Sequence, residues 1–275
     1  MKPAICHYSF HRTWVSKGWS VKELAQAVKE LGADGIDFHT RYLGDAGITA
    51  KDIKEALRAT RLHLCGLSIS NDFNQIDPTD FLTQIKTVIK WIEFASVVKA
   101  PVSRIFGGSI DDRKNKDTIE TGIARVINAL GEVVRVAEKN GVVLALENHG
   151  GLPGTGEEQV RILQAINSPS LRATVDMGNY LECGQEGEEG TKIAAPYAAY
   201  VHIKDYKKVS DRSNPWGWTL KNCAVGEGDV NHKKCIEILK ESSYDGYIAL
   251  EYEGTEVEET GVMKSFNYMK KLLEI

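Results

Sequence analysis

The sequence has few of the features that mark secreted, membrane-bound or nucleic-acid-binding proteins. Its five cysteines show no CxxC or other paired spacing, and this odd number favours reduced thiols and a cytoplasmic protein. No apolar run approaches the ~20 residues of a membrane span, and the start of the chain has no apolar stretch typical of a signal peptide. Lysine and arginine are scattered and the net charge is −4, so we expect neither a nucleic-acid nor a membrane partner.

Short apolar runs alternate with stretches of helical periodicity along the 275 residues. The apolar runs predict strands near 3–10, 35–38, 62–70, 102–106, 142–147, 171–176, 200–205 and 247–251. Helical spacing and capping-box motifs, such as those at 20–23 and 155–158, predict helices between them. The segment 179–199 is less periodic, and 204–230 is expected to be a long loop.

Eight strand–helix units in a chain of this size predict an α/β protein, a (β/α)8 TIM barrel that forms a single domain over residues 1–275. A doubly wound open sheet is the rival architecture. It usually has a glycine-rich phosphate loop after its first strand, and the loop at 10–14 contains no GxGxxG motif. The barrel is therefore the favoured fold.

Ligand-type side chains stand where four of the predicted strands end, and each directly follows an aliphatic residue. Because the carboxyl ends of the strands meet at the catalytic face of a barrel, we expect these side chains to converge there. Carboxylate oxygens with one imidazole nitrogen suit Mn²⁺, Mg²⁺ or Co²⁺ and also accept Zn²⁺. The sequence therefore predicts one divalent metal ion per chain, with the ligands Glu147, Asp176, His202 and Glu251.

Motifs around these residues resemble those of the xylose isomerase-like barrels, and in particular the sugar phosphate isomerase/epimerase group, which includes ketose 3-epimerases, hydroxypyruvate isomerase and inosose dehydratase. The resemblance covers nearly the whole chain and implies that the four residues bind one metal. It also implies that the two glutamates move the substrate proton. The motifs are Leu146-Glu-Asn-His-Gly-Gly151, Val175-Asp-Met-Gly-Asn179, His202-Ile-Lys-Asp205, Val225-Gly-Glu-Gly-Asp229 and Leu250-Glu251.

One position departs from the pattern of the ketose 3-epimerases, which usually carry a histidine three residues after the metal aspartate. That position is Asn179 here, which argues against a ketohexose 3-epimerase. Further side chains are candidate substrate contacts, although a turn, a solvated charge or a hydrogen-bonded barrel histidine is the alternative for most of them. The tryptophan-bearing loops 10–19 and 204–230 are expected to form the substrate wall. The candidate substrate contacts are His7, Trp14, His149, Asn179, Lys204 and Glu227.

These observations predict a metal-dependent isomerase or epimerase that acts on a sugar, polyol or keto-sugar derivative. The expected reaction is proton abstraction next to a carbonyl through an enediolate, with Glu147 and Glu251 as base and acid. The same groups serve elimination, so a dehydratase or lyase acting on a keto-sugar or cyclitol, including a keto-glycoside lyase, is the second interpretation. A non-catalytic sugar-binding barrel is more remote. The expected partner is a small carbohydrate, and association into a homo-oligomer is left open.

Overall fold

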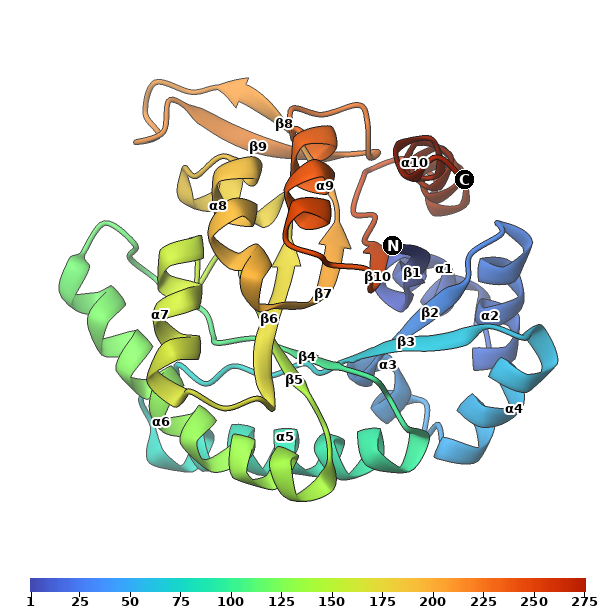
Figure 1. Ribbon diagram of the computed structural model, residues 1–275, viewed down its shortest axis with the longest axis horizontal. Helices are drawn as coiled ribbons and strands as arrows, with labels where there is room; N and C mark the ends of the chain where they lie inside the picture. Colours follow the sequence, from blue (N-terminus) through green and yellow to red (C-terminus); the bar gives the residue numbers. More distant parts are fainter.

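The computed structural model describes all 275 residues and contains a closed barrel of parallel strands (Figure 1). Around the barrel the strands follow the order β1-β10-β7-β6-β5-β4-β3-β2, so the first and last strands pair and close it. The predicted (β/α)8 barrel is therefore confirmed. The barrel strands are β1 (Lys2–Cys6), β2 (Gly35–His39), β3 (His63–Ser68), β4 (Ser103–Ile105), β5 (Leu144–Glu147), β6 (Leu171–Asp176), β7 (Ala198–Ile203) and β10 (Tyr247–Leu250).

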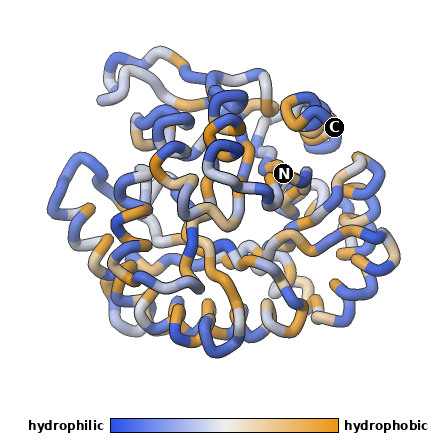
Figure 2. The backbone as a smooth tube through the Cα atoms, in the orientation of Figure 1, coloured by the Kyte–Doolittle hydropathy of each residue, from blue (hydrophilic) through white to orange (hydrophobic).

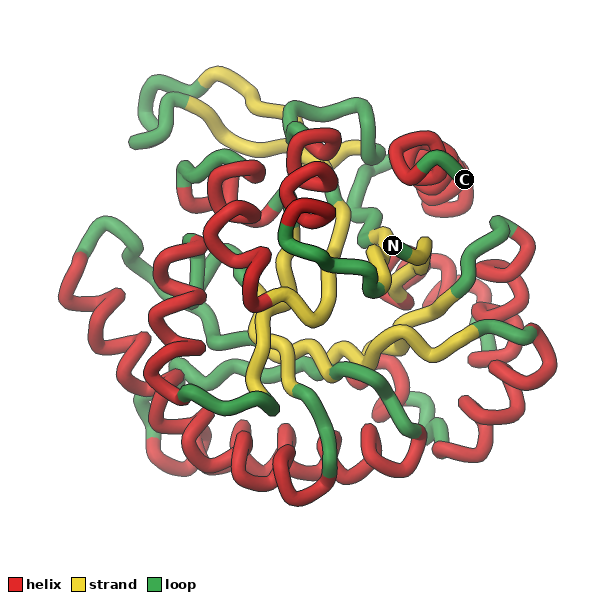
Figure 3. Tube along the Cα trace, viewed as in Figure 1, coloured by secondary structure: helices red, strands yellow, loops and turns green.

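Helices surround the barrel and connect its strands (Figure 3). Three short 3₁₀ helices, η1 (His7–Phe10), η2 (Asn179–Cys183) and η3 (Ala195–Tyr197), accompany them. None of the helices combines the length and the apolar character that crossing a membrane requires. The α-helices are α1 (His11–Lys17), α2 (Val21–Glu30), α3 (Thr40–Asp45), α4 (Ala50–Thr60), α5 (Pro78–Val98), α6 (Lys116–Asn140), α7 (Gly156–Ile166), α8 (Gly187–Ala194), α9 (His232–Glu241) and α10 (Glu258–Leu273).

Capping explains where some of these helices begin. The predicted capping box of α2 is present: Glu23 N–H donates to Ser20 Oγ at 3.3 Å, and Ser20 N–H donates to the Glu23 carboxylate at 2.8 Å. At α7 only half of the predicted box forms, with Glu158 N–H donating to Thr155 Oγ1 at 3.3 Å. The Glu158 carboxylate instead pairs with Arg113 at 2.7 Å, because an ion pair competes for the same oxygens.

Several segments differ from the sequence-based expectation. The first strand ends at Cys6, and the expected remainder of that strand is η1. The expected loop 204–230 contains an antiparallel hairpin of β8 (Asp205–Ser210) and β9 (Trp218–Cys223), seen at the top of Figure 1. This hairpin was missed because most of its side chains are partly or fully exposed, so it lacks the apolar run that reveals a buried strand.

The hydrophobic core has two parts. The larger part fills the space between the strands and the surrounding helices, along which hydrophobic and hydrophilic stretches alternate (Figure 2). The smaller part is a separate cluster of seven buried residues contributed largely by the barrel strands. It includes Ala145 and Ala249, each two residues before a candidate metal ligand on the same strand line. Small side chains at these positions leave room for the site above them.

Candidate metal centre and active site

The four predicted metal ligands converge at the carboxyl ends of neighbouring strands. Glu147 and Asp176 are the last residues of β5 and β6, His202 is the penultimate residue of β7, and Glu251 directly follows β10. One ligand atom from each side chain lies within 4.8 Å of all the others, and all four residues are buried. His202 Nδ1 faces both glutamates, at 2.9 Å from Glu147 Oε1 and 3.9 Å from Glu251 Oε2. The arrangement could hold a single metal ion.

Unpartnered oxygens in this cluster fit a cation. Asp176 Oδ1 accepts the backbone N–H groups of Gly178 at 2.8 Å and Asn179 at 2.9 Å, whereas its Oδ2 has no hydrogen-bond partner. Glu147 Oε2 also accepts no hydrogen bond, although it lies 3.2 Å from Arg104 Nε. A buried carboxylate oxygen without any partner, such as Asp176 Oδ2, is unfavourable in an apolar interior, and a divalent ion with oxygen preference would satisfy it.

The pKa values of the cluster also indicate a site for a cation. Burial raises the pKa of Asp176 to about 8, and the neighbouring carboxylates of Glu147 and Glu251 add to the rise despite the opposing charge of Lys204. Burial alone would lower the pKa of His202, but the Glu147 carboxylate outweighs it and raises this pKa to about 9. Without a cation the cluster therefore retains protons near neutral pH, and a divalent ion would displace them.

Two buried cations keep the glutamates charged. Arg104, on β4, places Nε 3.2 Å from Glu147 Oε2, and Lys204 places Nζ 3.0 Å from Glu251 Oε2 and 3.1 Å from Glu253 Oε1. Burial raises the pKa of both site glutamates, but these cations and His202 outweigh it, so both pKa values lie below their ordinary value. Both side chains are thus carboxylates able to accept a proton. A mid-strand arginine such as Arg104 predicts an ion pair, but the sequence does not reveal its partner.

Cys6, at the end of β1, contacts the other face of the imidazole. Its Sγ lies 3.6 Å from His202 Nε2, and both residues are buried. Because Nδ1 faces the carboxylates, Nε2 can carry the hydrogen that the sulfur accepts, which leaves Nδ1 free for a metal. Cys6 is absent from the sequence-based site, because no CxxC or cysteine–histidine spacing marks it.

A cavity of about 160 Å³ opens above the cluster, with Glu251 in its wall. His149, a predicted substrate contact, also lines it, and its ring centroid lies 4.5 Å from that of Phe106. The complete lining consists of Tyr8, His39, Arg41, Ser70, Arg104, Phe106, His149, Glu251 and Glu253. No residue of 10–19 or 204–230 contributes. The lining residues lie instead at the carboxyl ends of β1 to β5 and β10, or in the segments that follow these ends.

The other predicted substrate contacts do not line the cavity. Lys204 and Asn179 lie beside candidate metal ligands: Lys204 pairs with Glu251, while Asn179 is buried next to Asp176 and its Nδ2 lacks a partner. His7 belongs to η1 rather than to a strand, and it packs against Trp14 of α1 with ring centroids 4.4 Å apart.

His7 and Trp14 are both buried and do not line the cavity. Burial lowers the pKa of His7 to about 3, so its imidazole is neutral. Trp14 is held in α1 because residues 11–17 form a helix instead of the expected loop.

Glu227, which the sequence suggested as a substrate contact, lies away from the cavity. It is exposed, 3.6 Å from Lys264 Nζ, and lines neither the cavity nor the metal cluster. The physical reason lies in the turn that carries it. The backbone N–H groups of Gly226 and Gly228 both donate to Asp205 Oδ2 at 2.9 Å, which fixes the turn around Asp205 and leaves the side chain between them in solvent.

Comparison with known proteins identifies the family of this barrel. The family model described as "Xylose isomerase-like TIM barrel" matches residues 25–272. The chain belongs to this family. The chain spans about half the length of the curated relatives it matches. One such relative, the L-ribulose-5-phosphate 3-epimerase of Salmonella typhi, is 26% identical over 163 residues, which are 59% of this chain and 53% of the relative.

Two solved structures show the same fold over nearly the whole chain. The 3-keto-D-glucoside 4-epimerase of E. coli has a TM-score of 0.77 at 15% identity and covers 100% of both chains. A Bacillus anthracis protein assigned as a 3-DHS dehydratase has a TM-score of 0.76 at 17% identity, covering 98% of this chain and 99% of that one. At these identities the likeness concerns the fold alone.

Proposed function

We propose that this xylose isomerase-like barrel is a divalent-metal-dependent isomerase or epimerase of a keto-sugar or a related polyol derivative. One observation carries the proposal: a buried four-residue cluster contains two charged glutamates, and one of them, Glu251, lines the cavity. The curated sugar-phosphate epimerase relative supports a carbohydrate substrate. The five cysteines are all free, which supports the cytoplasmic localisation inferred from the sequence.

The roles of the residues follow from their positions. A divalent ion held by Glu147, Asp176, His202 and Glu251 would supply Lewis-acid polarisation of a substrate carbonyl. Glu147 and Glu251 extend from β5 and from the end of β10, which are separated in the barrel by β6 and β7. They can therefore approach a substrate carbon from different sides.

One glutamate removes the proton next to the carbonyl, and the other takes up a proton from solvent and returns it to the enediolate. Return to the opposite face of the same carbon gives epimerisation, and return to the neighbouring carbon gives isomerisation. Arg104 and Lys204 hold the two carboxylates in place by their ion pairs. His149, in the cavity wall, is positioned to contact a substrate hydroxyl.

A dehydratase or lyase is the second candidate. The same base would form the same enediolate, and loss of a β-substituent would then replace proton return. A protein assigned as a dehydratase has the same fold, so this fold is compatible with a dehydratase. Release of water, or of the group attached through a glycosidic oxygen, during turnover would identify it.

Solvent isotope incorporation tests the proposal. With a keto-sugar substrate and Mn²⁺ in D₂O, the wild type should place deuterium on the carbon next to the carbonyl. Glu147→Gln and Glu251→Gln should each lower turnover by ~10²–10⁴-fold, because glutamine preserves size but cannot act as a base. Glu237→Gln, on the outer surface of α9, is the matched control and should keep full activity.

Two results would contradict the proposed roles. Full activity of either glutamine variant would reduce that glutamate to a ligand or a spectator. Turnover without solvent deuterium in the product, together with complete tritium transfer from the neighbouring carbon, would indicate a hydride shift instead of proton transfer.

A further inference from the structure

A second cavity of about 420 Å³ adjoins the cavity above the metal cluster. The two share the lining residues Ser70, Phe106 and His149, so they form neighbouring lobes of one cleft. All lining residues of the second lobe follow the carboxyl ends of β3 to β6, on the catalytic face. The first lobe alone, at about 160 Å³, is smaller than the ~300–1,000 Å³ common for small-molecule sites. A substrate that occupies only the first lobe leaves most of the cleft empty.

The charge of the second lobe restricts what it can hold. Its only ionisable lining residues are Glu182 and His149, and no lysine or arginine lines it. The nearby Arg113 is not available, because it pairs with Glu158 at 2.7 Å and donates to the Gly151 carbonyl. Because Arg41 and Arg104 line the first lobe and not the second, a phosphate in the second lobe would meet a carboxylate without a cation in the same wall. Hydroxyl groups, in contrast, can donate to carboxylate oxygens and to backbone carbonyls.

Glu182 is fixed in position to accept such hydrogen bonds. It belongs to η2, and its Oε1 accepts the Tyr206 hydroxyl at 2.7 Å. The same hydroxyl lies 3.2 Å from Asn179 Oδ1, so its one hydrogen is shared between the two oxygens and Glu182 is connected to the residue beside the candidate metal ligand Asp176. The carboxylate therefore lines the lobe while its orientation is set from the metal side.

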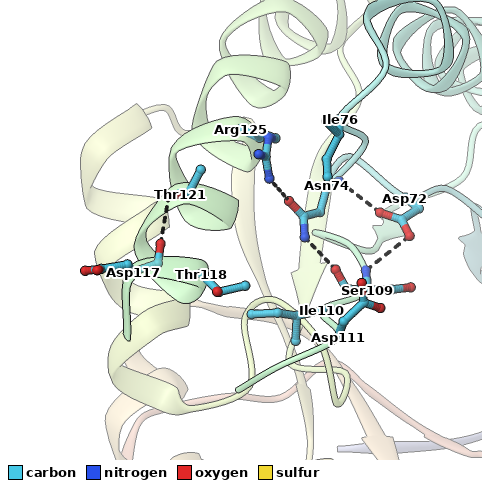
Figure 4. Close-up of a pocket in the computed structure, with 10 residues that line it drawn as sticks. All are labelled: Asp72, Asn74, Ile76, Ser109, Ile110, Asp111, Asp117, Thr118, Thr121 and Arg125. Atoms are coloured by element: carbon cyan, nitrogen blue, oxygen red, sulfur yellow. Dashed lines mark hydrogen bonds between the residues drawn. The ribbon is translucent and has the colours of Figure 1, made fainter. Parts of the chain in front are cut away.

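The loop that carries Ser109, a lining residue of the lobe, is held in place from outside the lobe. Figure 4 shows the neighbouring pocket, with Asn74 between Arg125 of α6 and Ser109, and Asp72 reaching Ser109 from the loop that also carries Asn74. Asn74 Oδ1 accepts from Arg125 at 2.8 Å, and its Nδ2 donates to the Ser109 carbonyl at 2.7 Å. These bonds tie the loop after β3 to the loop after β4. A wall that is ordered before binding lowers the entropic cost of holding a ligand.

We propose that the second lobe is a subsite for a neutral, hydroxyl-rich group attached to the keto-sugar, such as a second sugar ring. The substrate class is then a keto-glycoside or keto-disaccharide rather than a phosphorylated monosaccharide. This inference rests on the proposed function, because it assumes that a keto-sugar occupies the first lobe. Polar side chains of the lobe, with the Glu182 carboxylate at its end, recognise hydroxyls by accepting their hydrogen bonds.

Calorimetric titration of the Mn²⁺-loaded protein tests the subsite with three kinds of probe. They are D-fructose, the keto-disaccharides lactulose, isomaltulose and turanose, and D-fructose 6-phosphate. At least one disaccharide should bind ~10-fold more tightly than D-fructose, and the phosphorylated sugar should show no such gain. If D-fructose binds and no disaccharide gains affinity, or if the phosphorylated sugar binds most tightly, the subsite is refuted while the proposed function stands. Failure of every keto-sugar to bind would refute both.

Variants of the lobe separate recognition from folding. Glu182→Ala should remove the gain for the disaccharide and leave the dissociation constant of D-fructose within ~2-fold, whereas Glu182→Gln should keep part of the gain through its amide oxygen. Glu186→Ala is the matched control, because Glu186 lies on the next segment, pairs with Lys208 and does not line the lobe. An unchanged disaccharide gain in Glu182→Ala would overturn the assignment of this carboxylate to the subsite.

Discussion

Replacing Asp176 with asparagine tests whether the cluster is built around a cation. Asparagine keeps an Oδ1 that accepts the backbone N–H groups of Gly178 and Asn179. It puts an amide group where the unpartnered Oδ2 lies among the carboxylates of Glu147 and Glu251. The substitution therefore removes a metal ligand and, at the same time, a buried negative charge. We expect opposite effects with and without metal.

The expected magnitudes follow from the pKa. In the chelated protein, the folded-state pKa of Asp176 is about 8 against an ordinary value of 3.8, so the folded chain holds a proton that the unfolded chain has lost at neutral pH. Stability therefore falls as pH rises from 3.8 towards 8. At ~1.36 kcal/mol per pKa unit, this penalty at pH 7 has a ceiling of ~4 kcal/mol. The Asp176→Asn variant has no ionisable group at this position and therefore does not have this stability penalty.

Metal acts in the other direction. A divalent ion at 100 times its dissociation constant stabilises the wild type by ~2.7 kcal/mol, and the variant should lose most of this gain. Urea unfolding with EDTA and with Mn²⁺, at pH 4 and pH 7, measures both effects. Without metal the variant should be the more stable protein at pH 7, by ~1–4 kcal/mol, and the difference should be nearly absent at pH 4.

The control is Asp229→Asn, a change at an exposed loop carboxylate that accepts the Lys208 N–H. It should leave the metal-dependent stabilisation of the wild type intact. The reasoning is refuted if Asp176→Asn is destabilising at pH 7 without metal and is still stabilised by Mn²⁺. Such a result would mean that Asp176 is held by interactions within the protein rather than by a cation.

Two further substitutions test the residues that hold the ligands. Cys6→Ala should raise the dissociation constant of Mn²⁺ ~10-fold, because it removes the acceptor for His202 Nε2–H, and Cys6→Ser should restore part of the lost affinity. Equal Mn²⁺ affinities in titrations of the wild type and both variants would exclude this role. Arg104→Met should lower the free energy of unfolding of the metal-free protein by ~3–5 kcal/mol in urea, because it leaves Glu147 buried without its cation. A decrease below ~1 kcal/mol would show that the protein does not depend on this ion pair.

The convergence of the four candidate metal ligands was predictable from the sequence because each is a local feature. Glu147 and Asp176 each end an apolar run, and a parallel barrel brings such ends together whatever the details of packing. The partners of these ligands were not predictable. Cys6 and His202 are 196 residues apart and meet only because β1 closes the barrel next to β10. Their contact has no signature in spacing.

The loops that form the substrate wall were not predictable from the sequence. The sequence favoured the tryptophan-bearing loops as the substrate wall, but segment 11–17 is a helix and the 204–230 segment holds a hairpin. The second lobe is instead formed by short polar segments after β3 to β6. Such segments contain serine, asparagine and glycine, residues that are common in any turn, so their composition does not distinguish a binding surface from a simple connection.

The charges of the site divide its carboxylates into two kinds. Glu147 and Glu251 each have a buried cation within ion-pair distance, so their negative charge does not depend on a metal. Asp176 has no such ion pair, and burial raises its pKa to about 8. Its charge at neutral pH therefore depends on a bound cation. This difference suits Asp176 to be a ligand only, and it leaves the two glutamates able to bind metal and to accept a proton from the substrate.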